Sequence, residues 1–211
     1  MSSLSYTLIT DGRSDRAFMP ILNWLLMDLG LESVIKDTYA DLSLDPYPPK
    51  SLVDKINRAL ELYPCNLLFV HRDAEKEPRS IRKEEIEQAV AQAGVKDIPV
   101  VCVIPVRMLE AWLLFDEDAI RQAAGNPKGK CKLNLPALNK VESLPDPKNR
   151  LLELLEKASE LRGRQLKKFN SRGKIHRLAN VIDDFSSLYQ LSAFQELKQE
   201  LLIKLSSRDF L

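Results

Sequence analysis

The chain has 211 residues, of which 45% are hydrophobic and 29% are charged, and its formal net charge is +1. This length excludes two large domains, and this composition excludes a disordered chain. We therefore expect one sizeable core with a smaller appendage.

Targeting and redox signals are absent from the sequence. No apolar run approaches the roughly 20 residues that span a bilayer, and the stretch MSSLSYTLIT lacks the basic and apolar segments of a signal peptide. The three cysteines, Cys65, Cys102 and Cys131, are odd in number and have no CxxC spacing. We expect a cytoplasmic protein with no membrane partner, no disulfide and no zinc site.

The first part of the chain alternates strand and helix patterns. The stretch LSYTLIT, residues 4–10, predicts a short buried strand. Helical spacing of apolar residues after it predicts a helix over 14–30, capped by Ser14 or Asp15. A β-branched run over 34–39 predicts a second strand.

The pattern continues after the proline-rich link DPYPPK. A helix is predicted over 51–62, and NLLFVH predicts the third strand. Residues 79–94 predict a helix that ends at Gly94, and DIPVVCVIPV predicts a strand that is apolar on both faces. Helical periodicity resumes in MLEAWLLF. Continuously apolar strands between helices are typical of the α/β class, with a mainly parallel sheet covered on both faces by helices.

The character of the sequence changes near residue 120. A stretch rich in Pro, Asn and Lys follows, and then three amphipathic segments, LLELLEKASEL, KIHRLANVIDDF and SAFQELKQELLIKL. Residues 1–120 hold 13 Lys and Arg against 20 Asp and Glu, a net charge of −7, whereas residues 121–211 hold 18 against 10, a net charge of +8. We predict an α/β domain over 1–120, then a linker and a C-terminal helical lobe over 121–211.

Acidic residues follow three of the predicted strands. In an open parallel sheet, ligands bind beyond the carboxyl ends of the strands. Carboxylates that gather at such an edge are unfavourable without a counter-charge, which a divalent cation such as Mg²⁺ supplies through oxygen ligands. The residues at these turns are Asp11, Gly12 and Asp15 after the first strand, Asp73 and Glu75 after the third, and Glu110 after the fourth.

Each of these residues also has a structural explanation. Gly12 can serve a simple turn, and Asp15 can cap the first helix. Asp73 and Glu75 can be solvated and paired with Arg72 and Lys76.

Two more residues need the same comparison. Glu110 lies in an apolar context that requires a partner, for which Arg107 is the structural alternative. For His71 we favour a histidine at the strand end over a metal ligand, because Mg²⁺ disfavours imidazole.

Three ordered motifs, TDGRSDRAF, LLFVHRDAE and PVRMLEAWLL, resemble a Toprim-like bacterial family of unknown function. This family is related to the nuclease domains of the overcoming-lysogenisation-defect proteins. The similarity extends through DPKNRLLELL and SAFQELKQEL, and so over nearly the whole chain. It implies a Toprim-like sheet that binds Mg²⁺ or Mn²⁺.

The Toprim motifs are a Glu-Gly after the first strand and an Asp-x-Asp pair after a later one. Asp11 and Gly12 match the first motif, with Asp in place of Glu, and Asp73 and Glu75 match the second, with Glu in place of the second Asp. A second alignment places His71 and Asp73 on that pair. Glu110 matches a further acid of the nuclease branch.

The resemblance implies phosphodiester hydrolysis of DNA or RNA. Asp11, Asp73 and Glu110 are then the catalytic residues, and Asp11, Asp73, Glu75 and Glu110 the metal ligands, with Gly12, Asp15, Arg72 and Arg107 as accessory residues. Candidate cations for the charge of the transition state are Arg72, Lys76 and Arg107. The resemblance also implies a role in bacterial anti-phage defence together with an ABC-type ATPase partner. The sequence contains no GxxxxGK[ST] loop, so any ATP-driven step would need such a partner.

The segment LRGRQLKKFNSRGKIHR carries basic residues and no acid, and we predict that it contacts nucleic acid. A solvated connector between helices is the structural alternative. The contact residues are Arg162, Arg164, Lys167, Lys168, Arg172 and Lys174, with Arg177 and His176 beside them.

Two other functions fit the same features. One is a non-catalytic subunit with a degenerate site that binds nucleic acid or an ATPase, and the other is a phosphotransfer or nucleotide-hydrolysing enzyme. The sequence leaves the substrate, the number of metal ions and the oligomeric state open.

Overall fold

A computed structural model of the chain describes residues 3–207. Its centre is a sheet of four strands, β1 (Leu4–Ile9), β2 (Ile35–Tyr39), β3 (Leu67–His71) and β4 (Val100–Val103), in the order β2-β1-β3-β4. All three strand pairs are parallel. The predicted α/β class with a parallel sheet flanked by helices is therefore confirmed.

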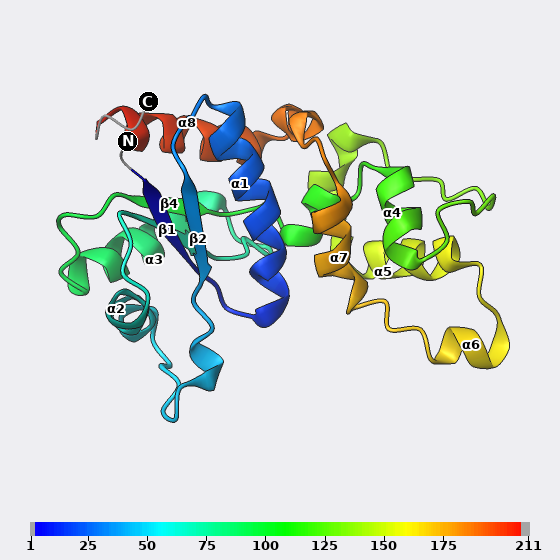
Figure 1. Cartoon of the computed structure of the whole chain (residues 1–211), viewed down its shortest axis with the longest axis horizontal. Coiled ribbons are helices and arrows are strands. Elements are labelled where there is room, and N and C mark those ends of the chain that lie inside the picture. The colour runs from blue at the N-terminus through cyan, green and yellow to red at the C-terminus, as the bar shows by residue number, and fades with distance from the viewer. Residues whose placement is uncertain (1–2, 208–211) are drawn as a thin grey trace.

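Helices cover both faces of the sheet (Figure 1). Helix α1 (Phe18–Asp28) packs on the face to which β1 contributes Tyr6 and Leu8. Helices α2 (Leu52–Leu62) and α3 (Arg79–Gln92) pack on the opposite face, together with Val70 of β3. Since successive side chains of a strand point to opposite faces, this double cover explains why β3 and β4 are continuously apolar up to His71 and Val103, whereas the edge strand β2 carries the exposed Lys36 and Asp37.

The remaining helices lie mainly beyond α1, on the right in Figure 1. They are the short 3₁₀ helix η3 (Leu109–Leu113), and α4 (Glu117–Ala124), α5 (Pro147–Ser159), α6 (Gly163–Lys167) and α7 (Lys174–Val181). Helix α4 packs against α5 and α7, and α7 also contacts α1 and the 3₁₀ helix η1 (Arg13–Ala17). Three further 3₁₀ helices are η2 (Leu42–Leu44), η4 (Leu138–Ser143) and η5 (Ser186–Gln190).

The last helix, α8 (Ser192–Ser206), returns to the sheet and packs beside β4. Its buried Leu197 and Leu201 belong to the same apolar core as Tyr6 and Phe69. A carboxylate oxygen of Glu200 accepts a hydrogen bond of 3.0 Å from the backbone N–H of Cys102, which covers part of the exposed edge of β4.

Three elements are shorter than the sequence pattern predicts. The helix predicted over 14–30 is divided into the 3₁₀ helix η1 and the α-helix α1, which begins only at Phe18. The fourth strand, predicted over 97–106, spans only Val100–Val103, because Pro99 and Pro105 flank it and proline donates no ladder hydrogen bond. The helical pattern of MLEAWLLF forms the single 3₁₀ helix η3, because Asp116 accepts a hydrogen bond from the N–H of Ala119 and starts a separate helix there. Within residues 3–207, no helix combines the length and apolar content that crossing a bilayer requires.

We predict that α8 unfolds together with the sheet. Phe194 is fully buried, with its ring 5.2 Å from that of Trp112, so Phe194→Ala should lower the free energy of unfolding by about 3–5 kcal/mol. The control Ile203→Ala lies on the same helix with 69% of its surface exposed, and it should change stability by less than about 0.5 kcal/mol. Urea unfolding monitored by circular dichroism measures both. Equal, small effects would mean that α8 is not part of the cooperative core.

Candidate functional site

The strand order places a topological switch point between β1 and β3, where the connections leave in opposite directions. In open parallel sheets, this point is where ligands bind, outside the carboxyl ends of the strands. The loop after β1 carries Asp15 here, the loop after β3 carries Asp73, and η3 brings Glu110 from the end of β4. Of the six residues that the sequence analysis placed at these turns, Asp15, Asp73 and Glu110 are near enough for the charge of Asp73 to affect the other two.

His71 is the last residue of β3, and it lies at the centre of this edge with only 1% of its surface exposed. Its Nδ1 lies 2.8 Å from the carbonyl oxygen of Val103, so Nδ1 carries the hydrogen. The ring packs on Phe18 at 4.4 Å between centroids. Nε2 then faces two carboxylates, 3.4 Å from Oδ1 of Asp73 and 3.9 Å from Oδ2 of Asp15.

Asp15 contributes both to the start of η1 and to the carboxylate cluster at this edge, by which we mean Asp15, Asp73 and Glu110. Oδ2 of Asp15 accepts a hydrogen bond of 2.9 Å from the backbone N–H of Gly12, the N-cap residue of η1. Asp15 thus stabilises the start of η1 from inside its first turn, and is not the N-cap residue of the first helix that the sequence offered as its structural explanation. Burial raises the pKa of Asp15, and the charge of Asp73 adds to that rise, while His71 and the Gly12 N–H oppose it. The contacts of Asp15 with His71 and with the N–H of Gly12 therefore do not fully offset the cost of burying its negative charge.

Glu110 is 3% exposed and lies on η3, behind Asp73. Burial raises the pKa of Glu110, Lys148 lowers it, and the charge of Asp73 raises it again. Nζ of Lys148, from the first turn of α5, lies 3.4 Å from Oε1 of Glu110. Lys148, and not Arg107, is thus the ion-pair partner of this buried acid among the described residues.

Asp11 lies outside this cluster. Its side chain is 45% exposed, and both of its oxygens face cations: Oδ1 is 2.9 Å from Nζ of Lys55, and Oδ2 is 3.1 Å from Nε of Arg72. Arg72 also lies 3.6 Å from Glu85 on α3. The predicted accessory residue Arg72 therefore neutralises Asp11 instead of facing the other acids.

Glu75 also points away from the cluster, with a side chain that is 68% exposed and 3.7 Å from Arg82. Its backbone has a left-handed φ of 54°, and its N–H donates a 2.9 Å hydrogen bond to the carbonyl of Arg107, whose φ is 67°. Two non-glycine residues in this region of φ store backbone strain, which is common at functional sites. They hold the loops after β3 and β4 side by side, so that Asp73 and Glu110 lie close together.

The donors at this edge fit a cation in their chemistry. Oδ1 of Asp73 is buried and has no hydrogen-bond partner, and the carboxyl groups of Asp15 and Glu110 both have raised pKa values. A divalent cation would supply the missing positive charge to these oxygen ligands. Within residues 3–207, however, no group of three or more His, Cys, Asp or Glu side chains is already arranged around a common metal position. Binding would thus require the side chains to move together.

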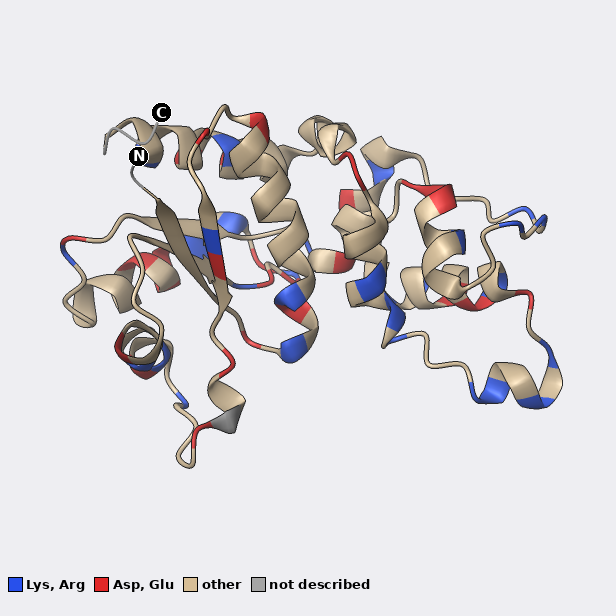
Figure 2. Cartoon of the chain, in the orientation of Figure 1, with Lys and Arg blue, Asp and Glu red and all other residues tan. Residues whose placement is uncertain are grey.

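The basic segment predicted to contact nucleic acid is exposed and lies along α6, the following loop and α7. Figure 2 shows Lys and Arg on both helices. Six of its cations, Arg162, Arg164, Lys167, Lys168, Arg172 and Lys174, form no salt bridge with any described acid. Helix α7 packs on η1, the 3₁₀ helix that carries Asp15. On α7, burial and the positive charge of the nearby Arg16 lower the pKa of His176. The cations thus extend from α6 to the loop that carries Asp15.

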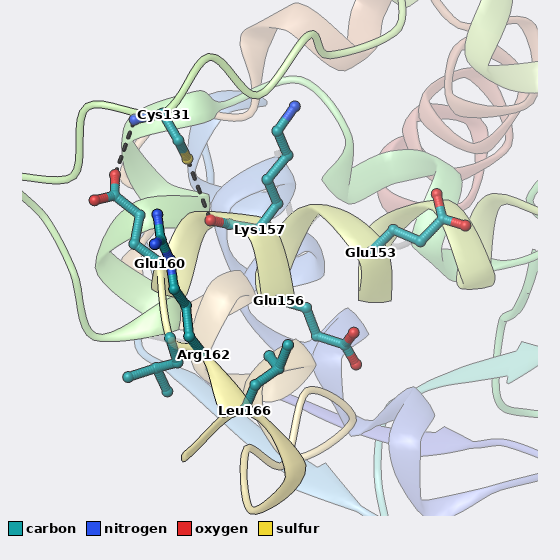
Figure 3. A pocket seen from close by; sticks show the side chains of 8 residues that line it. Cys131, Glu153, Glu156, Lys157, Glu160, Arg162 and Leu166 are labelled. Atoms are coloured by element: carbon teal, nitrogen blue, oxygen red, sulfur yellow. Dashed lines mark hydrogen bonds between the residues drawn. The ribbon is translucent and has the colours of Figure 1, made fainter. Parts of the chain in front are cut away.

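A pocket of 790 Å³ lies between α5 and α6, away from the carboxyl ends of the strands. Its wall includes Glu153, Glu156 and Glu160, and Sγ of Cys131 donates a hydrogen bond of 3.2 Å to the carbonyl of Lys157. Figure 3 shows the three glutamates pointing in different directions. These side chains do not converge, so this pocket offers no catalytic arrangement.

The structure confirms the interpretation of His71 as a histidine at the end of a strand, and adds its contacts with Asp73 and Asp15. Sequence reasoning missed one residue of the site. Lys148 was not singled out, because nothing local to a lysine after Asp146 and Pro147 indicates contact with Glu110. Comparison with known proteins gives no further guide: no family model, no curated protein and no solved structure matches the chain.

The buried carboxyl of Glu110 predicts a pH-dependent difference from Glu110→Gln. A raised pKa means that the folded state binds the proton more tightly than the unfolded state, so this group's contribution to stability falls as the pH rises above the ordinary value of 4.5. Relative to Glu110→Gln, the wild type should therefore lose stability on going from about pH 4 to pH 7. Urea unfolding across this range measures the difference. The exposed control Glu84→Gln should show a flat difference, and a flat profile for Glu110→Gln as well would contradict the burial of this charge.

Proposed function

We propose that the protein is a magnesium-dependent Toprim-like nuclease that hydrolyses phosphodiester bonds in DNA or RNA. The observation that carries this proposal is the mutual charge effect of Asp15, Asp73 and Glu110 at the switch point, where a buried oxygen of Asp73 has no hydrogen bond and faces only Nε2 of His71, at 3.4 Å, as an ion-pair partner among the described residues. Such a site favours a divalent cation. The unpaired cations of the C-terminal helical lobe beside it favour a polyanionic substrate.

In this proposal, Asp15, Asp73 and Glu110 hold the Mg²⁺ or Mn²⁺ ion. Asp73 and Glu110 are retained from the ligand set that the resemblance implies, whereas Asp15 replaces Asp11, and Glu75 is left out. When bound, the ion polarises a phosphate oxygen and lowers the pKa of a water that attacks phosphorus.

The other residues bind, orient and neutralise. His71 is fixed by Val103 and orients Asp73. The side chain of Lys148 is 42% exposed, and it can offer part of its positive charge to a phosphate that approaches Glu110. The cations along α6 and α7 hold the nucleic-acid backbone without reading its sequence.

A cellular role follows from the resemblance alone. We propose that the protein takes part in bacterial anti-phage defence, and that an ABC-type ATPase partner supplies any ATP-driven step. The absence of a phosphate-binding GxxxxGK[ST] loop from the sequence supports the need for such a partner.

One observation favours the alternative, a non-catalytic subunit that binds nucleic acid or an ATPase. Asp11 occupies the position of the Toprim glutamate, but Lys55 and Arg72 engage both of its oxygens. An acid that is neutralised in this way contributes nothing to the cluster as it stands. In the alternative, the fold and the cationic surface are kept and the chemistry is lost.

The proposed site predicts large effects on cleavage at two positions and a small effect at a third. Asp73→Asn and Glu110→Gln should each lower the cleavage rate by about 100-fold or more, since loss of groups that hold or orient a metal costs at least 10- to 100-fold. Glu75→Gln should stay within about threefold, because its carboxylate points to Arg82. The measurement is the rate of cleavage of circular DNA, linear DNA and RNA with Mg²⁺ or Mn²⁺.

The pattern across these three variants decides the assignment. Cleavage that survives in Asp73→Asn and Glu110→Gln would remove the proposed site. If the wild type binds nucleic acid but cleaves none of these substrates, with or without an ATPase partner, the non-catalytic alternative replaces the proposal.

The cationic surface predicts a steep dependence of nucleic-acid affinity on salt. Removing Arg164 and Lys168 together, as Arg164→Ala with Lys168→Ala, should reduce the slope of log affinity against log salt by about two. The control removes two exposed lysines elsewhere, Lys36 on β2 and Lys96 before β4, and should leave the slope unchanged. Fluorescence anisotropy in a salt series without divalent ions measures both. An equal slope in all three proteins would exclude α6 from the interface.

A further inference from the structure

A second cavity, of 390 Å³, opens directly beside Asp11 at the carboxyl ends of β1 and β2. The loop after β1, from Thr10 to Arg13, forms one wall. Leu42 and Ser43 of η2 and the prolines of the link to α2 form the opposite wall. The cavity is therefore continuous with the loop that carries Asp15, and its volume is in the range of small-ligand pockets.

The charged residues that line this cavity include one more cation than acid. Three cations, Arg13, Lys50 and Lys55, and two acids, Asp11 and Asp41, line it. Lys55 pairs with Asp11 at 2.9 Å, and Arg13 pairs with Asp41 at 3.4 Å. Lys50 is exposed and forms no salt bridge with the described residues, so the cavity presents a net positive charge at its opening. An anionic ligand is favoured there.

The walls add apolar surface and hydrogen-bonding groups. Leu42, Pro48 and Pro49 contribute the apolar part. The hydroxyl of Tyr39 donates to the carbonyl of Gly12 at 2.9 Å and lies 3.0 Å from the hydroxyl of Thr10, which fixes the floor of the cavity. An apolar wall, hydroxyl oxygens that can still accept hydrogen bonds, and a lysine without a salt bridge among the described residues together match the base, the sugar hydroxyls and the phosphate of a nucleotide.

We propose that this cavity holds one unpaired nucleotide of the substrate strand, adjacent to the phosphate that is cleaved. This inference rests on the proposed nuclease function and adds the substrate class, which is single-stranded nucleic acid or an unpaired segment. A base inside a duplex reaches such a cavity only after it leaves its stack, which costs a few kcal/mol. A single strand pays less of this cost, so its bases can lie against the apolar wall while Lys50 contacts a phosphate.

The test measures binding of a short fluorescent oligonucleotide by anisotropy in EDTA, so that no metal-dependent cleavage occurs. Lys50→Glu reverses the free charge, and Ser43→Trp fills the cavity from its exposed edge. Each should weaken binding of the single strand by about tenfold or more: Lys50→Glu because a charged contact is lost, and Ser43→Trp because the nucleotide is excluded from the cavity. The matched control Lys96→Glu makes the same charge change at the opposite end of the sheet, and should weaken binding less than about threefold. Thermal unfolding confirms that each variant is folded.

The outcomes separate this inference from the nuclease proposal. Binding that is equal in all four proteins, or tighter binding of a blunt duplex than of the single strand, would overturn it. A free mononucleotide that binds more tightly than the oligonucleotide would also overturn it, because the cavity would then be a small-molecule site. If cleavage fails in the wild type but both cavity variants lose binding, the nucleotide site stands and the nuclease proposal does not. If cleavage is normal and binding is insensitive to both variants, the reverse holds.

Discussion

The contact between the imidazole of His71 and the carbonyl of Val103 fixes the arrangement of the whole site. The Nδ1–H donates at 2.8 Å, and the ring is buried against Phe18, so Nε2 must point out of the carboxyl end of β3 toward Asp15 and Asp73. Burial lowers the pKa of His71, whereas its contacts with Asp73 and Asp15 raise it, and the net shift is upward. The histidine thus partly offsets the charge of two acids that would otherwise repel each other.

The cations around the site are distributed unequally. Those at the rim pair with the outer acids: Lys55 and Arg72 with Asp11, and Arg82 with Glu75. Among the described residues, the cationic groups that face the inner carboxylates are His71 and, farther back, Lys148, and an oxygen of Asp73 remains without a hydrogen bond. Burial raises the pKa of both Asp15 and Glu110, so an added cation at this position would offset the cost of their charged forms.

The central part of the sheet was predictable from the sequence, because a strand such as β3 that is buried on both faces needs apolar residues at successive positions. The same logic located the acids at the strand ends. It could not rank them, because the direction of a side chain depends on contacts remote in sequence: Asp11 turns toward Lys55 of α2, and Glu75 toward Arg82 of α3. For the same reason the distant Lys148 was not found, whereas Asp15 has two roles because a single oxygen, Oδ2, accepts the hydrogen bond from the N–H of Gly12 and also lies 3.9 Å from Nε2 of His71.

The C-terminal helices complete the site, although the sequence assigned them to a separate region. Lys148 of α5 reaches Glu110, and α7 packs on η1, which carries Asp15. Glu200 of α8 accepts a hydrogen bond from the N–H of Cys102, one residue before the carboxyl end of β4. The apolar core is likewise continuous from the sheet to α5, α7 and α8. If nucleic acid binds along α6 and α7 as proposed, it would lie on a helix that packs directly on η1, so binding there and the position of Asp15 would be coupled through this contact.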